Sequence, residues 1–151
     1  MSKQQLRQRS QQINQLSGKR FLITQPIIRN FTGSIVVTLE LAAYLQSQGA
    51  EVTVYTAFYD QPVKTAFENV NIKVASSKEE PNFALQDFDY IWVHSQILPY
   101  SIVRRLNELS KSSTRFIFLH MSPHHDLVPD EFPWIYQLED NLTNLRLVIS
   151  E

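Results

Sequence analysis

Short apolar runs alternate with longer amphipathic stretches along most of this chain. Short runs that are apolar throughout, or that alternate apolar and polar side chains, are typical of strands in a parallel sheet. The pattern predicts strands at six ranges: Arg20–Gln25, Ala50–Thr56, Asn71–Ala75, Asp89–Val93, Arg115–Leu119 and Leu145–Ile149.

Apolar residues at helical spacing predict helices between these strands. After the first strand, Ile35, Ala42 and Leu45 fall on one side of a helix. We expect Ser34 to cap the start of this helix and Gly49 to follow its end. Further helices are expected at Pro99–Lys111 and near Trp134–Asn141, and a short one within Ser76–Gln86.

The alternation of strands and helices predicts an α/β fold. We expect an open, doubly wound, mostly parallel sheet, Rossmann-like, between two layers of helices, because a strand–helix–strand unit almost always crosses over right-handed. The 151 residues fit one domain, which we place at residues 19–151. Residues 1–18 are expected to form a polar helix or a tail, and the sequence leaves open whether it docks on the domain.

Composition narrows the function classes. The formal net charge of −1 provides no long-range positive field, so we expect no nucleic-acid partner. The absence of cysteine excludes disulfides and thiolate metal sites. No apolar run approaches the ~20 residues that span a bilayer, and the N-terminus has no signal-peptide core, so the expected location is the cytoplasm.

Basic residues on the helix expected at Pro99–Lys111 leave one membrane question open. Arg104, Arg105 and Lys111 most simply form a solvated face. The alternative is a peripheral contact with phospholipid at the inner face of the membrane or with a partner.

Ligands of doubly wound sheets bind at the carboxyl ends of the strands, near the point where the strand order reverses. The loop Gln25–Ser34 is expected there, and it leads into the start of a helix. Such a start presents free N–H groups and a partial positive charge, which suit a phosphate. Gly33 would let a ligand approach the backbone closely, although the alternative is that Gly33 only turns the chain.

Glycine usage excludes two nucleotide-binding motifs. This loop holds one glycine, so it forms neither a G-x-G-x-x-G dinucleotide fingerprint nor a P-loop. The strand ends Thr24–Gln25 and Ala75–Ser76 also lack the carboxylates that a receiver domain needs.

Two histidines, His94 and His120, end neighbouring predicted strands. A histidine there can donate a hydrogen bond, move a proton or stabilise developing charge, or it can simply hold a loop carbonyl. His120, His124, His125 and Asp126 match no helical zinc motif, and we expect no metal site. After the second strand, Tyr55, Phe58 and Tyr59 could stack on a sugar ring or pack a loop.

These motifs, in this order, resemble the retaining GT-B glycosyltransferases, specifically the acceptor-side domain of the glycosyltransferase family 4-like group. The segments that carry the resemblance are FTGSIVVTLELAAYL, LQSQGAEVTVYT, DYIWVHS, FIFLH and VISE, and they cover about Lys19 to Glu151. Two positions depart from the family pattern. Thr32–Gly33 stands where the family has a glycine pair, and Gly49–Ala50–Glu51–Val52 stands where it has G-H-E-V.

The resemblance implies the acceptor-binding half of an enzyme that moves a sugar from a UDP- or GDP-sugar to a glycan, lipid or other acceptor. It implies no cofactor and no metal, a second C-terminal domain that binds the donor, and an inactive isolated chain. His120 would contact the transferred sugar, and Thr32, Gly33 and Ser34 would face the donor phosphates. The implied acceptor-binding residues are Arg29, Asn30, His94, Ser95, Gln96 and His124.

Two other functions remain open from the sequence. One is a non-catalytic partner or binding module of the same fold, and the other is an unrelated nucleotide-binding α/β domain. The first would keep the strand-end loops covered, whereas the second would bind nucleotide without another domain.

Overall fold

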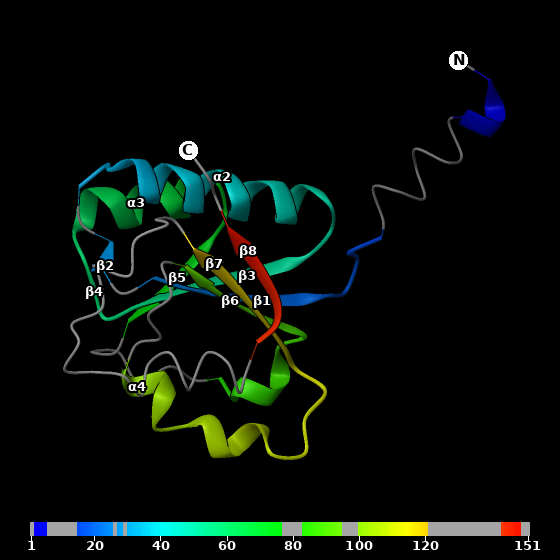
Figure 1. Ribbon diagram of the computed structural model, residues 1–151. Coiled ribbons are helices and arrows are strands. Elements are labelled where there is room, and N and C mark those ends of the chain that lie inside the picture. The colour runs from blue at the N-terminus through cyan, green and yellow to red at the C-terminus, as the bar shows by residue number, and fades with distance from the viewer. Residues whose placement is uncertain are drawn as a thin grey trace.

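The computed structural model describes residues 2–5, 15–25, 27–28, 30–76, 83–94, 100–120 and 143–148. Its centre is a 6-stranded sheet in the order β5-β3-β1-β6-β7-β8, and every pairing in it is parallel (Figure 1). The order reverses between β1 and β6, as in a doubly wound Rossmann-like sheet, so the predicted fold class is confirmed. The strands are β1 (Arg20–Thr24), β3 (Glu51–Thr56), β5 (Lys73–Ser76), β6 (Tyr90–His94), β7 (Arg115–His120) and β8 (Thr143–Val148).

Helices cover both faces of this sheet in three layers (Figure 1). One face carries the helices α2 (Gly33–Ser47) and α3 (Gln61–Asn69). The other carries α4 (Tyr100–Val103) and two 3₁₀ helices, η1 (Leu85–Asp87) and η2 (Leu106–Leu109). A separate two-stranded parallel sheet joins β2 (Ile27–Ile28) to β4 (Phe58–Tyr59).

Alternation along the strands divides the core into two clusters. Phe21 and Ile23 of β1 pack on the α2 side with Val63 and Phe67 of α3. Leu22 lies on the opposite side with Ile91, Phe118 and other buried residues. Burying a large apolar side chain is worth roughly 1.5–3 kcal/mol, so both faces contribute to stability.

One helix and one small sheet were not predicted. Asp60 begins α3 by accepting a hydrogen bond from the Val63 N–H at Oδ1 over 3.1 Å, and a proline lies in the first turn. Val63 and Phe67, four residues apart, are both fully buried. The sequence therefore carried a capping signal and an apolar pair that indicate a helix. The pairs Ile27 with Phe58 and Ile28 with Tyr59 that form β2 and β4 leave no comparable trace, because each strand has two residues.

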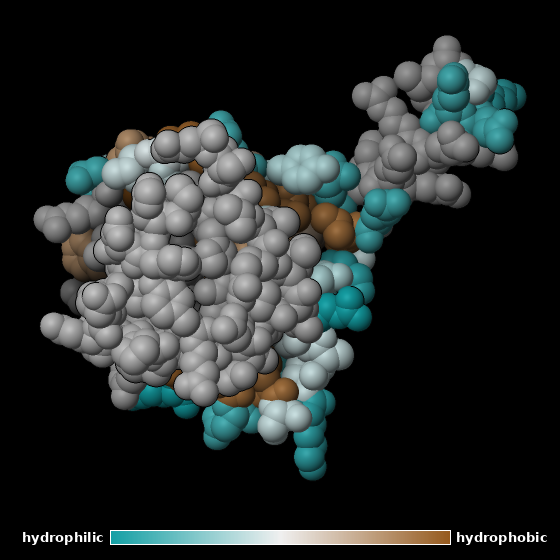
Figure 2. Space-filling view, in the orientation of Figure 1, coloured by the Kyte–Doolittle hydropathy of each residue, from teal (hydrophilic) through white to brown (hydrophobic). Residues whose placement is uncertain are grey.

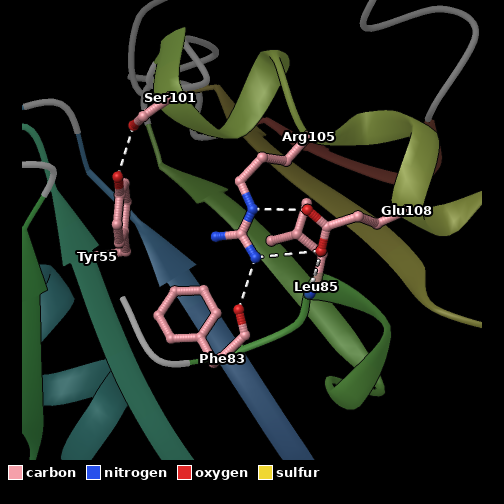
Figure 3. Close-up of polar contacts among 6 residues, drawn as sticks. All are labelled: Tyr55, Phe83, Leu85, Ser101, Arg105 and Glu108. Atoms are coloured by element: carbon pink, nitrogen blue, oxygen red, sulfur yellow. Dashed lines mark hydrogen bonds and ion pairs between the residues drawn. The ribbon is translucent and has the colours of Figure 1, made fainter. Parts of the chain in front are cut away.

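The predicted helix Pro99–Lys111 is wrong beyond its first turn, because α4 ends at Val103 and η2 follows (Figure 3). The Arg105 guanidinium makes bonds of 2.7 Å and 3.1 Å to both carboxylate oxygens of Glu108, and it donates to the Phe83 carbonyl over 2.6 Å. Glu108 in turn accepts from the Leu85 N–H over 3.2 Å. The pairing of Arg105 with Glu108, three residues apart, suits the three residues per turn of the 3₁₀ helix η2, and the bond from Leu85 attaches η1 to η2.

Arg105 therefore does not belong to a solvated face, which corrects that part of the prediction. Its side chain is 27% exposed, whereas Arg104 and Lys111 are exposed. Its guanidinium also lies over the Phe83 ring, 5.5 Å from the ring centroid. The residue packs and pairs within the fold.

Of the two predictions for the ends of α2, one is wrong and one is confirmed. The prediction that Ser34 caps the helix is wrong, because Thr32 occupies the N-cap position and Ser34 lies inside the first turn. The prediction for Gly49 is confirmed: its φ is 93°, and an added Cβ would lie 3.1 Å from the Ser17 Cα. Only glycine adopts this left-handed conformation at low cost, so the turn into β3 depends on it.

The N-terminal segment is described in part. Ser2 and Gln5 exchange hydrogen bonds of 2.9 Å and 3.1 Å, as a capping box does, and the residues there are exposed and hydrophilic (teal in Figure 2). Leu16 packs against the α2-side cluster. The predicted helix near Trp134–Asn141 lies outside the described residues. Among the described helices, none has the length and apolar character to cross a bilayer.

Candidate functional site

The switch point of the sheet lies where β1 and β6 end side by side. Thr24 is the register partner of Val93, and the next residues along each chain are Gln25 and His94. Side chains alternate between the two faces along a strand, and Ile23 and Trp92, two residues before Gln25 and His94, pack on the α2 side. Gln25 and His94 are therefore neighbours at the carboxyl edge, on the face that α2 covers.

Gly33 opens α2 at this edge. Its φ is not in the left-handed region, and a Cβ added to it would meet no atom within 4 Å. Neither backbone conformation nor crowding requires a glycine here. The residue is exposed and leaves open space in front of the helix start.

The start of α2 lacks the usual side-chain partners. Thr32 makes no capping hydrogen bond, and the first turn holds no acidic residue. The first N–H groups of a helix have no acceptor inside it, and together they carry a partial positive charge. This end of α2 can therefore accept an anion without displacing a side-chain cap.

A buried glutamine fixes the first turn of α2 to the end of β1. Gln25 is 3% exposed, and its Nε2 donates to the Ser34 Oγ over 2.7 Å. Its Oε1 accepts from the Thr38 hydroxyl, also over 2.7 Å. The Gln25 backbone N–H donates to the Tyr55 carbonyl over 3.0 Å. Sequence reasoning placed Ser34 at this site but missed Gln25, which carried no motif.

His94 lies below the surface rather than on it. It is 0% exposed, and neither ring nitrogen has a hydrogen-bond partner among the described residues. Burial lowers the pKa of the imidazole from 6.5 to about 4, so the ring is neutral at pH 7. Direct contact with an acceptor therefore requires that the atoms covering the ring move, and the acceptor-binding role stays a prediction.

His120 ends β7 next to these residues. Leu119 is the register partner of His94, and His120 follows it as the partner of Val148. The backbones of the two histidines thus end neighbouring strands, as the sequence predicts. The structure describes the backbone of His120 and not its side chain, and Arg29, Ser95, Gln96 and His124 lie outside the described residues.

Asn30 is exposed and has a φ of 60°. Its N–H donates to the Asp60 Oδ2 over 2.9 Å, and the Asp60 N–H donates to the Ile28 carbonyl over 3.0 Å. Together with the pairing of β2 and β4, these bonds join the first two loops of the carboxyl edge. Sequence reasoning placed Asn30 at the site but missed Asp60.

Tyr55 near the end of β3 and Phe58 just after it have different surroundings. Tyr55 is 1% exposed, and its hydroxyl bonds the Ser101 hydroxyl (Figure 3), so it packs the core and cannot stack on a sugar. Phe58 remains 40% exposed at the carboxyl edge. A polar cavity of about 420 Å³ lies elsewhere, at the amino edge of the sheet, lined by Gln86, Glu108, Lys111, Ser112 and Ser113.

Within the described part of the chain, no three histidine, aspartate or glutamate side chains gather as metal ligands would. His124, His125 and Asp126 lie outside that part. No protein-family model matches the chain, and no curated protein sequence matches it either.

Proposed function

We propose that this chain is the acceptor-binding half of a retaining GT-B glycosyltransferase of the family 4-like group. In this proposal the chain works with a donor-binding domain that supplies a UDP- or GDP-sugar, and it presents a glycan, a lipid-linked sugar or another acceptor. Thr32, Gly33 and Ser34 face the donor phosphates. His120 contacts the transferred sugar from the end of β7.

The observation that carries the proposal is the open start of α2 at the switch point. Gly33 has no structural need to be a glycine, and a side chain there would occupy the space in which a ligand can approach the helix. Uncapped N–H groups beside that space suit the oxygens of a diphosphate. Doubly wound sheets bind their ligands at this position.

Calorimetry on the 151-residue chain tests the division of labour between the two domains. UDP-glucose, GDP-glucose and GDP-mannose are expected to bind weakly or not at all, because the donor-binding contacts belong to the other domain. Binding in the low micromolar range would instead support a nucleotide-binding domain that works alone.

A mixing experiment tests the transfer itself. The chain is combined with separately expressed donor-binding domains of retaining GT-B enzymes and with labelled UDP- and GDP-sugars. Transfer to an acceptor is expected only when both proteins are present. If a donor-binding domain that docks on the chain still gives no transfer, the chain is a binding module and not half of an enzyme.

A further inference from the structure

We propose that Gln25 is a positioning residue, which holds the Ser34 hydroxyl as a hydrogen-bond donor toward a phosphate-type oxyanion at the start of α2. The inference rests on the proposed function only for the identity of that oxyanion, which is there the donor diphosphate. The site itself is argued from contacts of the described residues.

A hydroxyl group has one proton to donate and can accept elsewhere. The Thr38 hydroxyl supplies the Gln25 Oε1, and the Gln25 Nε2 supplies the Ser34 Oγ, each over 2.7 Å. Ser34 therefore accepts from inside the fold, and its own proton is available in the outward direction. The three side chains form a chain of donors that ends at Ser34.

The two inner members of this chain of donors are buried. Gln25 is 3% exposed and Thr38 is 0% exposed, so solvent does not compete for their polar atoms. The Thr38 hydroxyl has the Ser34 carbonyl as a second acceptor at 3.1 Å, so its one proton is shared between the shorter bond to Gln25 and the backbone of the same turn. Ser34 itself is half-buried, next to the open space at Gly33. The hydroxyl thus meets a ligand at the position where the N–H groups of the first turn also point.

His94 provides an independent indication of a ligand. Its ring is fully buried, and both nitrogens lack a partner among the described residues. A buried polar group without a partner is costly, and native structures rarely keep one without a reason. By the alternation along β1 and β6, His94 and Gln25 both lie on the α2 side of the sheet, at the ends of neighbouring strands. A neutral imidazole donates from one nitrogen, and an oxyanion can accept that bond once the atoms that cover the ring move.

An oxyanion fits this corner better than a cation. The helix N–H groups and the Ser34 hydroxyl at this edge are donors, the buried His94 ring on the neighbouring strand is neutral, and the first turn of α2 holds no carboxylate. Bonds from such donors to an ionised oxygen are shorter and stronger than bonds between neutral groups.

The test uses inorganic pyrophosphate as the probe, titrated into the ¹⁵N-labelled chain at constant ionic strength. We expect dose-dependent shifts of the Gly33 and Ser34 amide signals. Gln25→Met and Ser34→Ala are each expected to weaken binding by about fivefold, because each removes one directed donor. Gln46→Met is the matched control, since Gln46 lies at the far end of α2 and donates over 3.2 Å to the Asn71 carbonyl.

The double variant with Gln25→Met and Ser34→Ala distinguishes a positioning role of Gln25 from a purely structural one. If Gln25 acts through Ser34, then Gln25→Met adds no further loss to the Ser34→Ala chain. An equal further loss in that background would overturn the proposal, as would a Ser34→Ala chain that binds pyrophosphate as tightly as the unchanged one. Should Gln25→Met fail to fold, Thr38→Val takes its place under the same comparison.

The result is independent of the transferase assay. Pyrophosphate that binds with the expected coupling, in a chain that never supports sugar transfer, would keep this inference and reject the proposed function. Transfer activity that is unchanged by Ser34→Ala would keep the proposed function and reject the inference.

Discussion

The backbone N–H of Asn30 donates a hydrogen bond to the Asp60 Oδ2 over 2.9 Å. The other oxygen of the same carboxylate accepts from the Val63 N–H at the start of α3. One side chain therefore holds the loop before α2 and the first turn of α3 at the same time. Two of the loops that surround the candidate site are fixed relative to each other by this carboxylate.

Replacing Asp60 by alanine should lower the free energy of unfolding by about 2 kcal/mol, because a helix cap and a loop bond are lost together. Asp60→Asn, which can keep one acceptor, should cost about half as much. Urea unfolding followed by circular dichroism measures both. Equal losses in the two variants would mean that only the negative charge of Asp60 matters.

The buried imidazole of His94 makes stability depend on pH. Because its pKa in the folded chain is lowered from 6.5 to about 4, protons bind the unfolded chain first as the pH falls. Stability should therefore decrease from pH 6.5 down to pH 4, by about 1.4 kcal/mol per unit and about 3 kcal/mol in all. Above pH 6.5 the ring is neutral in both states and contributes no slope.

Urea unfolding at several pH values between 7.5 and 4, roughly the span in which histidine titrates, measures this slope. His94→Leu and His94→Gln, which do not titrate, should both flatten it relative to the unchanged chain. A steep slope that persists in both variants would assign the pH dependence to other groups.

The sequence predicted the elements that depend on local pattern and missed those that depend on distant contacts. The predicted strand ends differ from those in the structure by at most two residues, because apolar runs identify strands and pairing decides where they stop. The helix Pro99–Lys111 failed because Arg105 bonds the Phe83 carbonyl, a residue far away in sequence. Gln25 was missed for the same reason, since its partners belong to α2.

The bond between Arg105 and Glu108 provides a second prediction on pH. The hydrogen bond from Arg105 lowers the pKa of the Glu108 carboxyl from its ordinary value of 4.5. The contribution of this bond to the free energy of unfolding is therefore fully present above pH 4.5 and is lost as the pH falls through the lowered pKa. Glu108→Gln should cost about 1 kcal/mol at neutral pH. The cost should shrink in acid, where the original carboxyl is protonated as well.

Glu68→Gln is the control for this change. Glu68 pairs with Lys64 over 3.5 Å and is 48% exposed, so its removal should alter unfolding by less than about 0.5 kcal/mol. Thermal or urea unfolding of the two variants distinguishes the partly buried pair from the exposed one. A larger loss of unfolding free energy for Glu68→Gln than for Glu108→Gln would contradict the prediction that the partly buried pair contributes more.

Gly33 and Gly49 should respond in opposite ways to alanine. Gly33→Ala should leave stability unchanged or raise it by about 0.5 kcal/mol, because its φ suits any residue and its surroundings are open. Gly49→Ala should lose about 2 kcal/mol, because its φ is 93° and the Ser17 Cα lies 3.1 Å from the added carbon. A stable Gly33→Val chain that no longer binds pyrophosphate would indicate that the open space serves a ligand.

His120→Ala should reduce sugar transfer at least about a hundredfold when turnover is assayed with a donor-binding domain present, because the histidine is proposed to stabilise charge at the reacting sugar. Acceptor binding should change little. Unchanged turnover would remove His120 from the chemistry. Tyr44→Ala, at an exposed position near the opposite end of α2, is the control for loss of a surface aromatic side chain.

The two-sided core has a consequence for how the chain folds. The unit from β1 through α2 and α3 to β5 is contiguous in sequence, so its strands can pair after short loops close. Leu22, Tyr55 and Ala75 belong to the other cluster, whose remaining members arrive with residues 83–118. A nascent chain that ends before β6 would expose these side chains together with the unpaired edge of β1, and it should therefore aggregate unless a chaperone covers that surface.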